Sequence, residues 1–180
     1  APARSGGGQG HLQVTHSAAL LFFITGLQAV AVQAQMSNLD VAVDVVDAIT
    51  ARLDNGALIT VGSTGNTRGG AGKLDIQVYC SEGWIDLDYI ANTAVVHRSD
   101  GSEERLDPDA KDGGGNFPEA GPYLYPADAP VHNLVEIILG RHPNRSPGIV
   151  GWRTVELLDA AYRSAAEDGR IVTVDSLYSG

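Results

Sequence analysis

The 180-residue sequence has one cysteine and few basic residues, and each shortage excludes a class of protein. Cys80 cannot form an internal disulfide or a site of several thiolates, and the alternating pattern of residues 73–80 predicts that its thiol is buried. The 12 Lys and Arg against 22 Asp and Glu give a formal net charge of -10. Because binding to a polyanion requires a concentrated cationic face, this balance argues against a nucleic-acid-binding protein.

Long apolar runs are also missing. Residues 5–39 contain no Asp, Glu, Lys or Arg, but polar side chains interrupt them, and the longest apolar run there covers only residues 18–24. A membrane-spanning helix needs about 20 mainly apolar residues. We therefore expect no membrane segment, and because no signal peptide is visible, we expect a cytoplasmic location.

The patterns along the chain predict an α/β (α+β) fold. We expect one domain over residues 1–180, with a mainly antiparallel, open-faced sheet and helices packed on its other face. The stretch "VTHSAALLFFITG" predicts a helix that ends at Gly26. This helix is apolar nearly all round and should therefore be deeply packed.

Two hairpins and two further helices complete the predicted fold. Asn55-Gly56 separates two strand-like runs and accepts the positive φ angles of a tight hairpin turn. A second hairpin is expected around residues 81–83, followed by another short strand. The later helices are predicted within residues 126–140 and 151–169.

The glycine-rich stretch "SGGGQG" at residues 5–10 has the composition of a phosphate-binding loop. It lacks the Gly-Lys-Ser/Thr ending of a P-loop and the preceding strand of a dinucleotide fingerprint. We therefore favour a flexible turn that leads into the buried helix.

Among the histidines, His16 is the strongest candidate for chemistry. It lies near the start of the apolar helix, with Gln13 three residues earlier on the same face. An imidazole that faces a cleft can exchange a proton near neutral pH. The alternative is a core histidine satisfied by hydrogen bonds.

Other polar groups are weaker candidates. His132 and Glu136 lie four residues apart on a predicted helix, but they supply only two ligands where a metal site needs three or four. We therefore expect no metal site. Asp40, Asp44 and Asp47 are interpreted as an acidic, solvated surface rather than as paired catalytic acids.

Several of these stretches resemble one enzyme family. The sequence "GGGQGHLQVTHSAALLFFITG" resembles the glycine-rich, histidine-bearing helix in the second domain of the Gfo/Idh/MocA oxidoreductases. The tail "TVELLDAAYRSAAEDGRIVTV" looks like the closing helix and strand of that family. The segments between, including "LDNGALITVGSTG" and "CSEGWIDLD", look like its sheet strands in order. The resemblance covers residues 6–174.

The resemblance implies a role for His16, which matches the family's catalytic histidine. The family's aspartate stands four residues earlier, where this sequence has Leu12, so proton transfer would depend on His16. Gln13, Gln9 and Tyr123 are the expected substrate-binding residues. The family's NAD(P) and catalytic lysine belong to a Rossmann domain, so no cofactor-binding residue is expected in this chain.

The resulting hypothesis is that the chain is the substrate-binding and oligomerisation portion of an NAD(P)-dependent oxidoreductase. The substrate would be a sugar, a polyol or a related hydroxy compound. Because the chain starts without Met and shortly before the helix, we expect a fragment that lacks a first strand, binds no nicotinamide and is inactive by itself. The alternative is a stand-alone binding or scaffold module that kept the fold and lost the redox chemistry.

The expected partners follow from this hypothesis. They are a small-molecule substrate, a Rossmann domain in the full-length protein or in a separate chain, and further copies of the chain. Apolar strand faces exceed what one layer of helices must cover, which favours a homo-oligomer. These faces carry Leu74, Ile76, Val78, Ile85, Leu87 and Tyr89.

Overall fold

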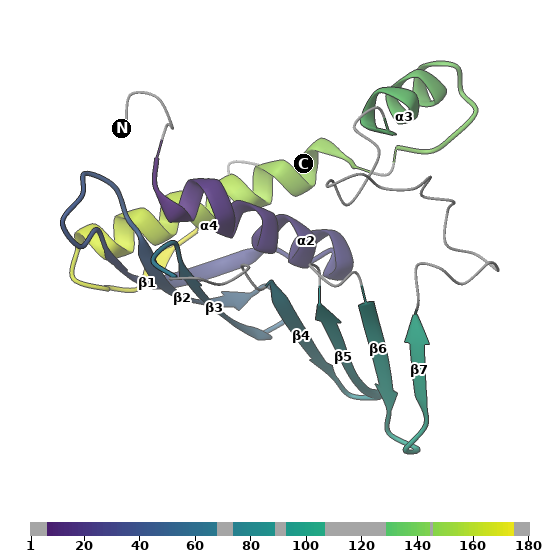
Figure 1. Cartoon of the computed structure of the whole chain (residues 1–180), viewed down its shortest axis with the longest axis horizontal. Coiled ribbons are helices and arrows are strands. Elements are labelled where there is room, and N and C mark those ends of the chain that lie inside the picture. Colours follow the sequence, from purple (N-terminus) through teal and green to yellow (C-terminus); the bar gives the residue numbers. More distant parts are fainter. Residues whose placement is uncertain (1–6, 68–73, 89–92, 107–128, 145, 175–180) are drawn as a thin grey trace. The chain divides into compact units, whose positions relative to one another are not determined.

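The computed structural model describes residues 7–67, 74–88, 93–106, 129–144 and 146–174 (Figure 1). The chain divides into two compact units, one of residues 1–68 and 146–180 and one of residues 69–145. The prediction of a single domain over residues 1–180 stays a prediction. In chain order the elements are the π-helix η1 (Gly10–Val14), α2 (Thr15–Thr25), β1 (Ala29–Ser37), β2 (Val46–Leu53), β3 (Leu58–Thr64), β4 (Asp75–Cys80), β5 (Gly83–Asp88), β6 (Thr93–Arg98), β7 (Glu103–Leu106), α3 (Ala129–Ile138), α4 (Gly148–Ala166) and β8 (Val172–Thr173).

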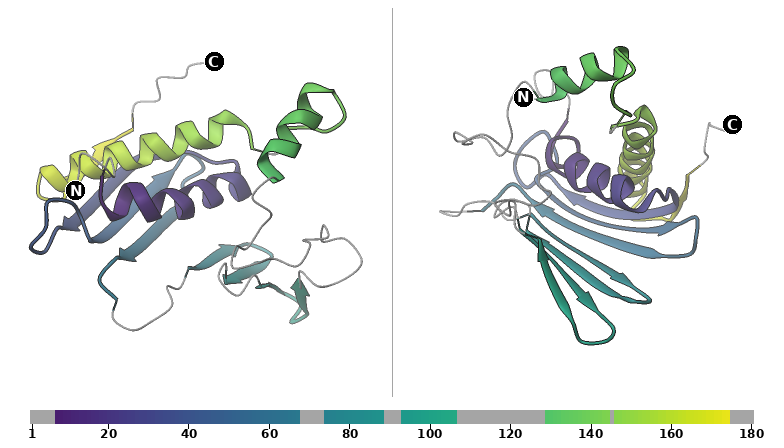
Figure 2. Two further views of the ribbon diagram at one scale, coloured as in Figure 1. Left: turned by 45° about the horizontal axis from the view of Figure 1, so that its top comes forward. Right: turned by 90° about the vertical axis from the view of Figure 1, so that its right-hand side faces the viewer.

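The first unit is an antiparallel sheet with helices on one face. Its strands are ordered β3-β2-β1-β8, and α2 and α4 lie side by side over the sheet (Figure 2). Along β2 the residues are alternately exposed and buried, as expected for a strand with one covered face. The predicted antiparallel α+β fold with one open face is thereby confirmed.

The core of this unit lies between the two helices and the sheet. Its largest fully buried apolar side chains are those of Phe22, Ile49, Leu157, Val14 and Val32. The prediction that the first helix is deeply packed is wrong for part of its surface, because Phe23 is 56% exposed. The sheet and α4 cover only one side of α2, so some apolar side chains on its other side stay exposed.

Glycines end α2 and shape the first hairpin as the sequence predicts. Gly26 has a φ of 67° and donates its amide to the Phe22 carbonyl at 3.0 Å, which stops the helix. In the β2–β3 turn Gly56 has a φ of 89°. The Asn55 side chain accepts a hydrogen bond from the Ala57 amide at 2.9 Å and so stabilises the turn.

The second unit contains a meander of four antiparallel strands, β4-β5-β6-β7. The predicted hairpin at residues 81–83 is confirmed, with Val78 opposite Ile85 and Ile85 opposite Val96 in one half-buried apolar row. Cys80 is exposed, so the prediction of a buried thiol is wrong. Cys80 is the last residue of β4, where the strand enters its turn.

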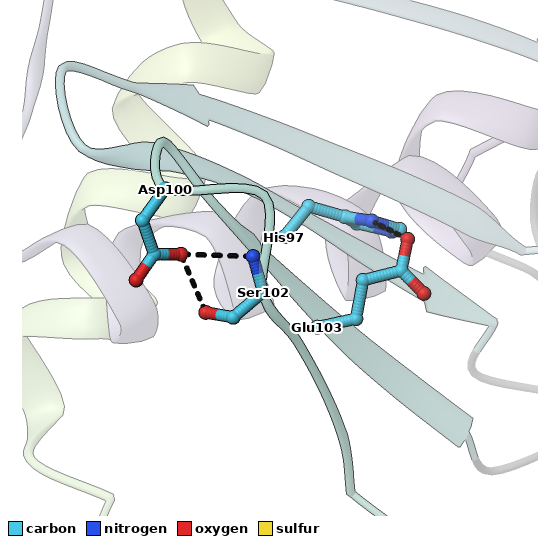
Figure 3. A network of polar contacts seen from close by, with 4 residues as sticks. All are labelled: His97, Asp100, Ser102 and Glu103. Carbon is cyan, nitrogen blue, oxygen red and sulfur yellow. Dashed lines mark hydrogen bonds and ion pairs between the residues drawn. The ribbon is translucent and has the colours of Figure 1, made fainter.

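The opposite face of this sheet carries a polar and aromatic row. Tyr79, Trp84 and His97 stack on neighbouring strands, with ring centroids 5.9 Å and then 3.8 Å apart. His97 Nδ1 lies 2.9 Å from Glu103 Oε1 on β7 (Figure 3). In the β6–β7 turn, the Ser102 hydroxyl and amide both donate to Asp100, and these bonds lower the pKa of the Asp100 carboxyl (Figure 3).

Candidate functional site

The glycine-rich turn before α2 is held by Asp44, which lies in the connection between β1 and β2. The Asp44 carbonyl accepts the Gln9 amide at 2.9 Å. Its carboxylate accepts the Gly10 amide at 2.7 Å through Oδ2 and the Tyr162 hydroxyl at 2.8 Å through Oδ1. One aspartate therefore connects the start of the first helical segment to α4. A carboxylate is also favourable at a helix N-terminus, where the backbone amides are electropositive.

Two of the glycines are required by this packing. A Cβ atom on Gly8 would lie 2.3 Å from the Asp44 carbonyl oxygen and from Oδ1. A Cβ atom on Gly10 would lie 2.8 Å from the Tyr162 hydroxyl oxygen. Both separations are far shorter than a normal contact, so larger residues would force the aspartate and the tyrosine away.

The same geometry does not fit the pyrophosphate of a dinucleotide. Such a site needs free backbone amides at a helix N-terminus. Here the Gln9 and Gly10 amides already donate to Asp44, and the carboxylate would repel a phosphate. Within the described residues, the glycine-rich stretch is thus an intramolecular anchor for the helix.

Asp47 lies in the core close to this anchor. It is 2% exposed, since it shares a face of β2 with the buried Ile49, Ala51 and Leu53. Neither of its carboxylate oxygens has a hydrogen-bond partner among the described residues. Burial, followed by the negative charge of Asp44, raises the pKa of Asp47 to about 7.

The interpretation of Asp40, Asp44 and Asp47 as a solvated acidic surface is therefore wrong for two of them. Only Asp40 is exposed, whereas Asp44 is half-buried and Asp47 fully buried. The close spacing of the three aspartates in the sequence suggested that they lie along one exposed edge. The connection after β1 instead folds Asp44 back onto the start of the first helical segment. In β2 side chains alternate between the two faces of the sheet, and Asp47 lies on the buried face.

An open cavity of about 570 Å³ borders the anchor. The His11 ring lies beside the Tyr162 ring in its wall, with centroids 4.7 Å apart. Burial and the hydrogen bond to Asp44 raise the pKa of Tyr162 above its usual range. The remaining lining residues are Gly7, Gly8, Met36, Asn38, Ala42, Val43, Asp44, Ala165 and Ala166.

The predicted site residues are only partly brought together. His16 and Gln13 are both exposed on the first helical segment, and neither lines this cavity. The alternative of a core histidine is thereby excluded for His16. Leu12, at the position where the resemblance expects an aspartate, is 48% exposed.

Gln9 and Tyr123 have different outcomes. The Gln9 side chain donates from Nε2 to the Ser63 hydroxyl at 2.9 Å, which connects the turn to β3. The side-chain amide of Gln9 therefore already has a hydrogen-bond partner. Tyr123 lies outside the described residues.

Sequence reasoning missed Asp44, Asp47 and Tyr162 as a connected group. The alternation in "VDAITARL" already places Asp47 on the same face as three apolar residues, and this signal could have predicted a buried carboxyl. No pattern in the sequence connects Asp44 to Tyr162, which lies 118 positions later.

No group of three or more His, Cys, Asp or Glu side chains within the described residues could hold a metal ion. No helix in the described part of the chain has the length and apolarity needed to cross a membrane.

Comparison with known proteins agrees with the resemblance seen in the sequence. Residues 1–86 match the sequence model of the family described as GFO/IDH/MocA C-terminal domain. Residues 1–86 are therefore similar to this C-terminal domain. The matched segment contains the glycine-rich turn, α2 with His16, and the sheet strands from β1 to β4. No curated protein sequence matches the chain.

Solved structures of oxidoreductases share the fold of this chain. An oxidoreductase domain protein from Kribbella flavida is 19% identical, with a TM-score of 0.75 over 95% of this chain and 51% of that one. The aldose-aldose oxidoreductase from Caulobacter crescentus, complexed with glycerol, is 21% identical, with a TM-score of 0.73 over 96% and 49%.

A third similar structure is the WlbA dehydrogenase from Bordetella pertussis in complex with NADH and UDP-GlcNAcA. It is 19% identical, with a TM-score of 0.65 over 94% of this chain and 46% of that one. The chain therefore spans about half the length of the solved structures that it matches.

Proposed function

We propose that this chain is the substrate-binding and oligomerisation portion of an NAD(P)-dependent oxidoreductase. Its substrate would be a sugar, a polyol or a related hydroxy compound. The observation that carries the proposal is the exposed pair of His16 and Gln13 on a firmly anchored helix, within the segment that matches the family.

The chemistry of the pair suits an alcohol or carbonyl substrate. A neutral imidazole can accept the proton of a substrate hydroxyl, and the imidazolium can return it to a carbonyl oxygen in the reverse direction. The exposed His16 side chain has no hydrogen bond or ion pair within the described part of the chain, so its ring nitrogens are available. Gln13, exposed three residues earlier, can donate to or accept from a second hydroxyl group.

NAD(P) supplies hydride transfer in such enzymes. Since the amides of the glycine-rich turn are occupied by Asp44, the proposal gives cofactor binding to a Rossmann domain, in the full-length protein or in a separate chain. The complexes of similar structures support this class of reaction, since one holds NADH with a nucleotide sugar and another holds glycerol.

The apolar face of the second unit supports the oligomerisation role. Val78, Ile85 and Val96 form one row across three strands and are only half-buried. Apolar rows of this kind on a sheet commonly pack against a second subunit. We therefore propose a homo-oligomer, most simply a dimer related by a two-fold axis.

The rival proposal is a binding or scaffold module without redox activity. It is favoured by Leu12, which leaves His16 without the carboxylate that the resemblance expects one turn earlier. A scaffold would keep the fold and the oligomer but would have no use for a proton-transferring His16.

The test uses the full-length polypeptide that contains this chain. Reduction of NAD⁺ and NADP⁺ is measured with glycerol, D-glucose, L-tartrate and a UDP-linked sugar acid as probes. We expect turnover with at least one probe, and the His16→Ala variant should lose about 100-fold or more of kcat. The exposed His142→Ala is the matched control and should keep wild-type turnover. Turnover unchanged in His16→Ala would remove this residue from the mechanism, and no turnover with any probe would favour the scaffold.

A further inference from the structure

Asp44 caps the first helical segment with two of its groups and reaches α4 with a third. Its main-chain carbonyl and its Oδ2 accept two consecutive amides, those of Gln9 and Gly10. Its Oδ1 accepts the Tyr162 hydroxyl from α4. The carboxylate thus fixes both the position of the turn and its rotation relative to the rest of the unit.

The anchored turn is a π-helix rather than an α-helix. In η1 the Thr15 amide donates to the Gly10 carbonyl, five residues back. A π-turn holds one more residue than an α-turn, and each residue of an α-helix advances the side-chain direction by about 100°. The side chains after the π-turn therefore point about 100° away from where a continuous α-helix would direct them.

His16 follows this π-turn directly. Gln13 is inside η1, whereas His16 is the second residue of α2. If the turn reverted to an α-helical one, His16 would point about 100° away from its present direction relative to the residues before the turn. Gly10, whose amide donates to Asp44, also closes the π-turn, because its carbonyl accepts the Thr15 amide.

We propose that Asp44 is a positioning residue, which fixes the start of the turn against α4 and thereby sets the direction of His16 after the turn. This inference rests on the proposed function of His16. Asp44 makes no hydrogen bond to Gln13 or His16 and acts through the backbone of the turn. The tyrosine hydroxyl supports it by holding the carboxylate against α4.

The first test measures amide hydrogen exchange in the full chain. In Asp44→Asn the carboxylate charge is lost and only one side-chain oxygen remains, so the Gly10 amide and the Tyr162 hydroxyl lose their shared charged acceptor. We expect residues 9–15 to exchange about tenfold or more faster, with α4 unchanged. Asp40→Asn, an exposed aspartate of the same connection, should leave exchange at the wild-type rate. Wild-type exchange of residues 9–15 in Asp44→Asn would overturn the inference.

A second variant covers the case in which Asp44→Asn fails to fold. Tyr162→Phe removes only the hydroxyl and leaves the bond from the Gly10 amide to Asp44. It should speed exchange of residues 9–15 by a smaller factor than Asp44→Asn, while the core stays folded. If Tyr162→Phe leaves this exchange unchanged, the support from α4 is refuted.

The last test separates positioning from stability in the full-length polypeptide. Asp44→Asn should lower kcat/KM by about tenfold or more, and the double variant with His16→Ala should be no slower than His16→Ala alone. Additive losses would overturn the positioning role. If His16→Ala by itself has no effect, the proposed function fails, whereas the exchange data still decide whether Asp44 fixes the turn.

Discussion

The pH dependence of stability should identify Asp47 as a buried, proton-carrying group. The change is Asp47→Asn, which keeps the shape of the side chain but cannot ionise. Asp47 is 2% exposed, and neither carboxylate oxygen has a hydrogen-bond partner in the described residues. Ionisation would therefore place an unpaired charge in the core, next to the charge of Asp44.

The magnitude follows from the two pKa values. The pKa of Asp47 is about 7 in the folded chain and 3.8 in its ordinary environment. Below pH 3.8 the carboxyl is protonated in both states and has no effect on stability. Between these values only the unfolded chain releases the proton, so the folded state loses about 1.4 kcal/mol per pH unit. The loss reaches about 4 kcal/mol above pH 7 and then stays constant.

The expected result is a difference between two pH values. At pH 5 the ionisation of Asp47 costs the wild type about 1.6 kcal/mol, and at pH 8 about 4 kcal/mol. Asp47→Asn has no ionisation cost at either pH. Burying its neutral amide also changes the stability, but by the same amount at both pH values. The variant should therefore gain about 2–3 kcal/mol relative to the wild type between pH 5 and pH 8.

The assay is urea denaturation followed by helical circular dichroism, because α2 and α4 both belong to the unit that contains Asp47. Asp40→Asn, which also removes one negative charge but from an exposed position, is the control. The reasoning is refuted if the stability of Asp47→Asn minus that of the wild type is equal at the two pH values.

Three further results are expected. Gly8→Ala should lose about 2 kcal/mol or more in denaturation because its Cβ would lie 2.3 Å from Asp44, whereas Gly62→Ala, where nothing lies within 4 Å, should be nearly neutral. Val78→Arg should convert the proposed oligomer to monomers in light scattering, and Gln77→Arg on the opposite face should not; a wild-type monomer at micromolar concentration would contradict this prediction. Titration of the isolated 180 residues with NADH or NADPH should give no binding at micromolar cofactor, and a micromolar Kd would contradict the assignment of cofactor binding to another domain.

Local patterns predicted most of the secondary structure because they depend on neighbours in the chain. The helix ending at Gly26 and the hairpin at Gly56 are decided by backbone conformations that glycine adopts readily. The alternation in β2 likewise follows from the two-residue period of a strand. Even the burial of Asp47 was present in this pattern, although the nearby aspartates suggested a surface.

The candidate site was predicted only in part. The order of residues in the first helix indicated His16 and Gln13, and the structure leaves both exposed. The sequence offered two interpretations of the glycines, a phosphate-binding loop and a flexible turn. Neither includes the contact with Asp44 that requires Gly8 and Gly10.

Only the tertiary structure decided how the turn is held and in which direction the helix points. The sequence by itself determined where the chain turns, where the helices end and which family its first half matches. The bonds from Gly10 and Tyr162 to Asp44 join positions separated by 34 and 118 residues. Such contacts form when the sheet brings distant segments together, and no local propensity records them.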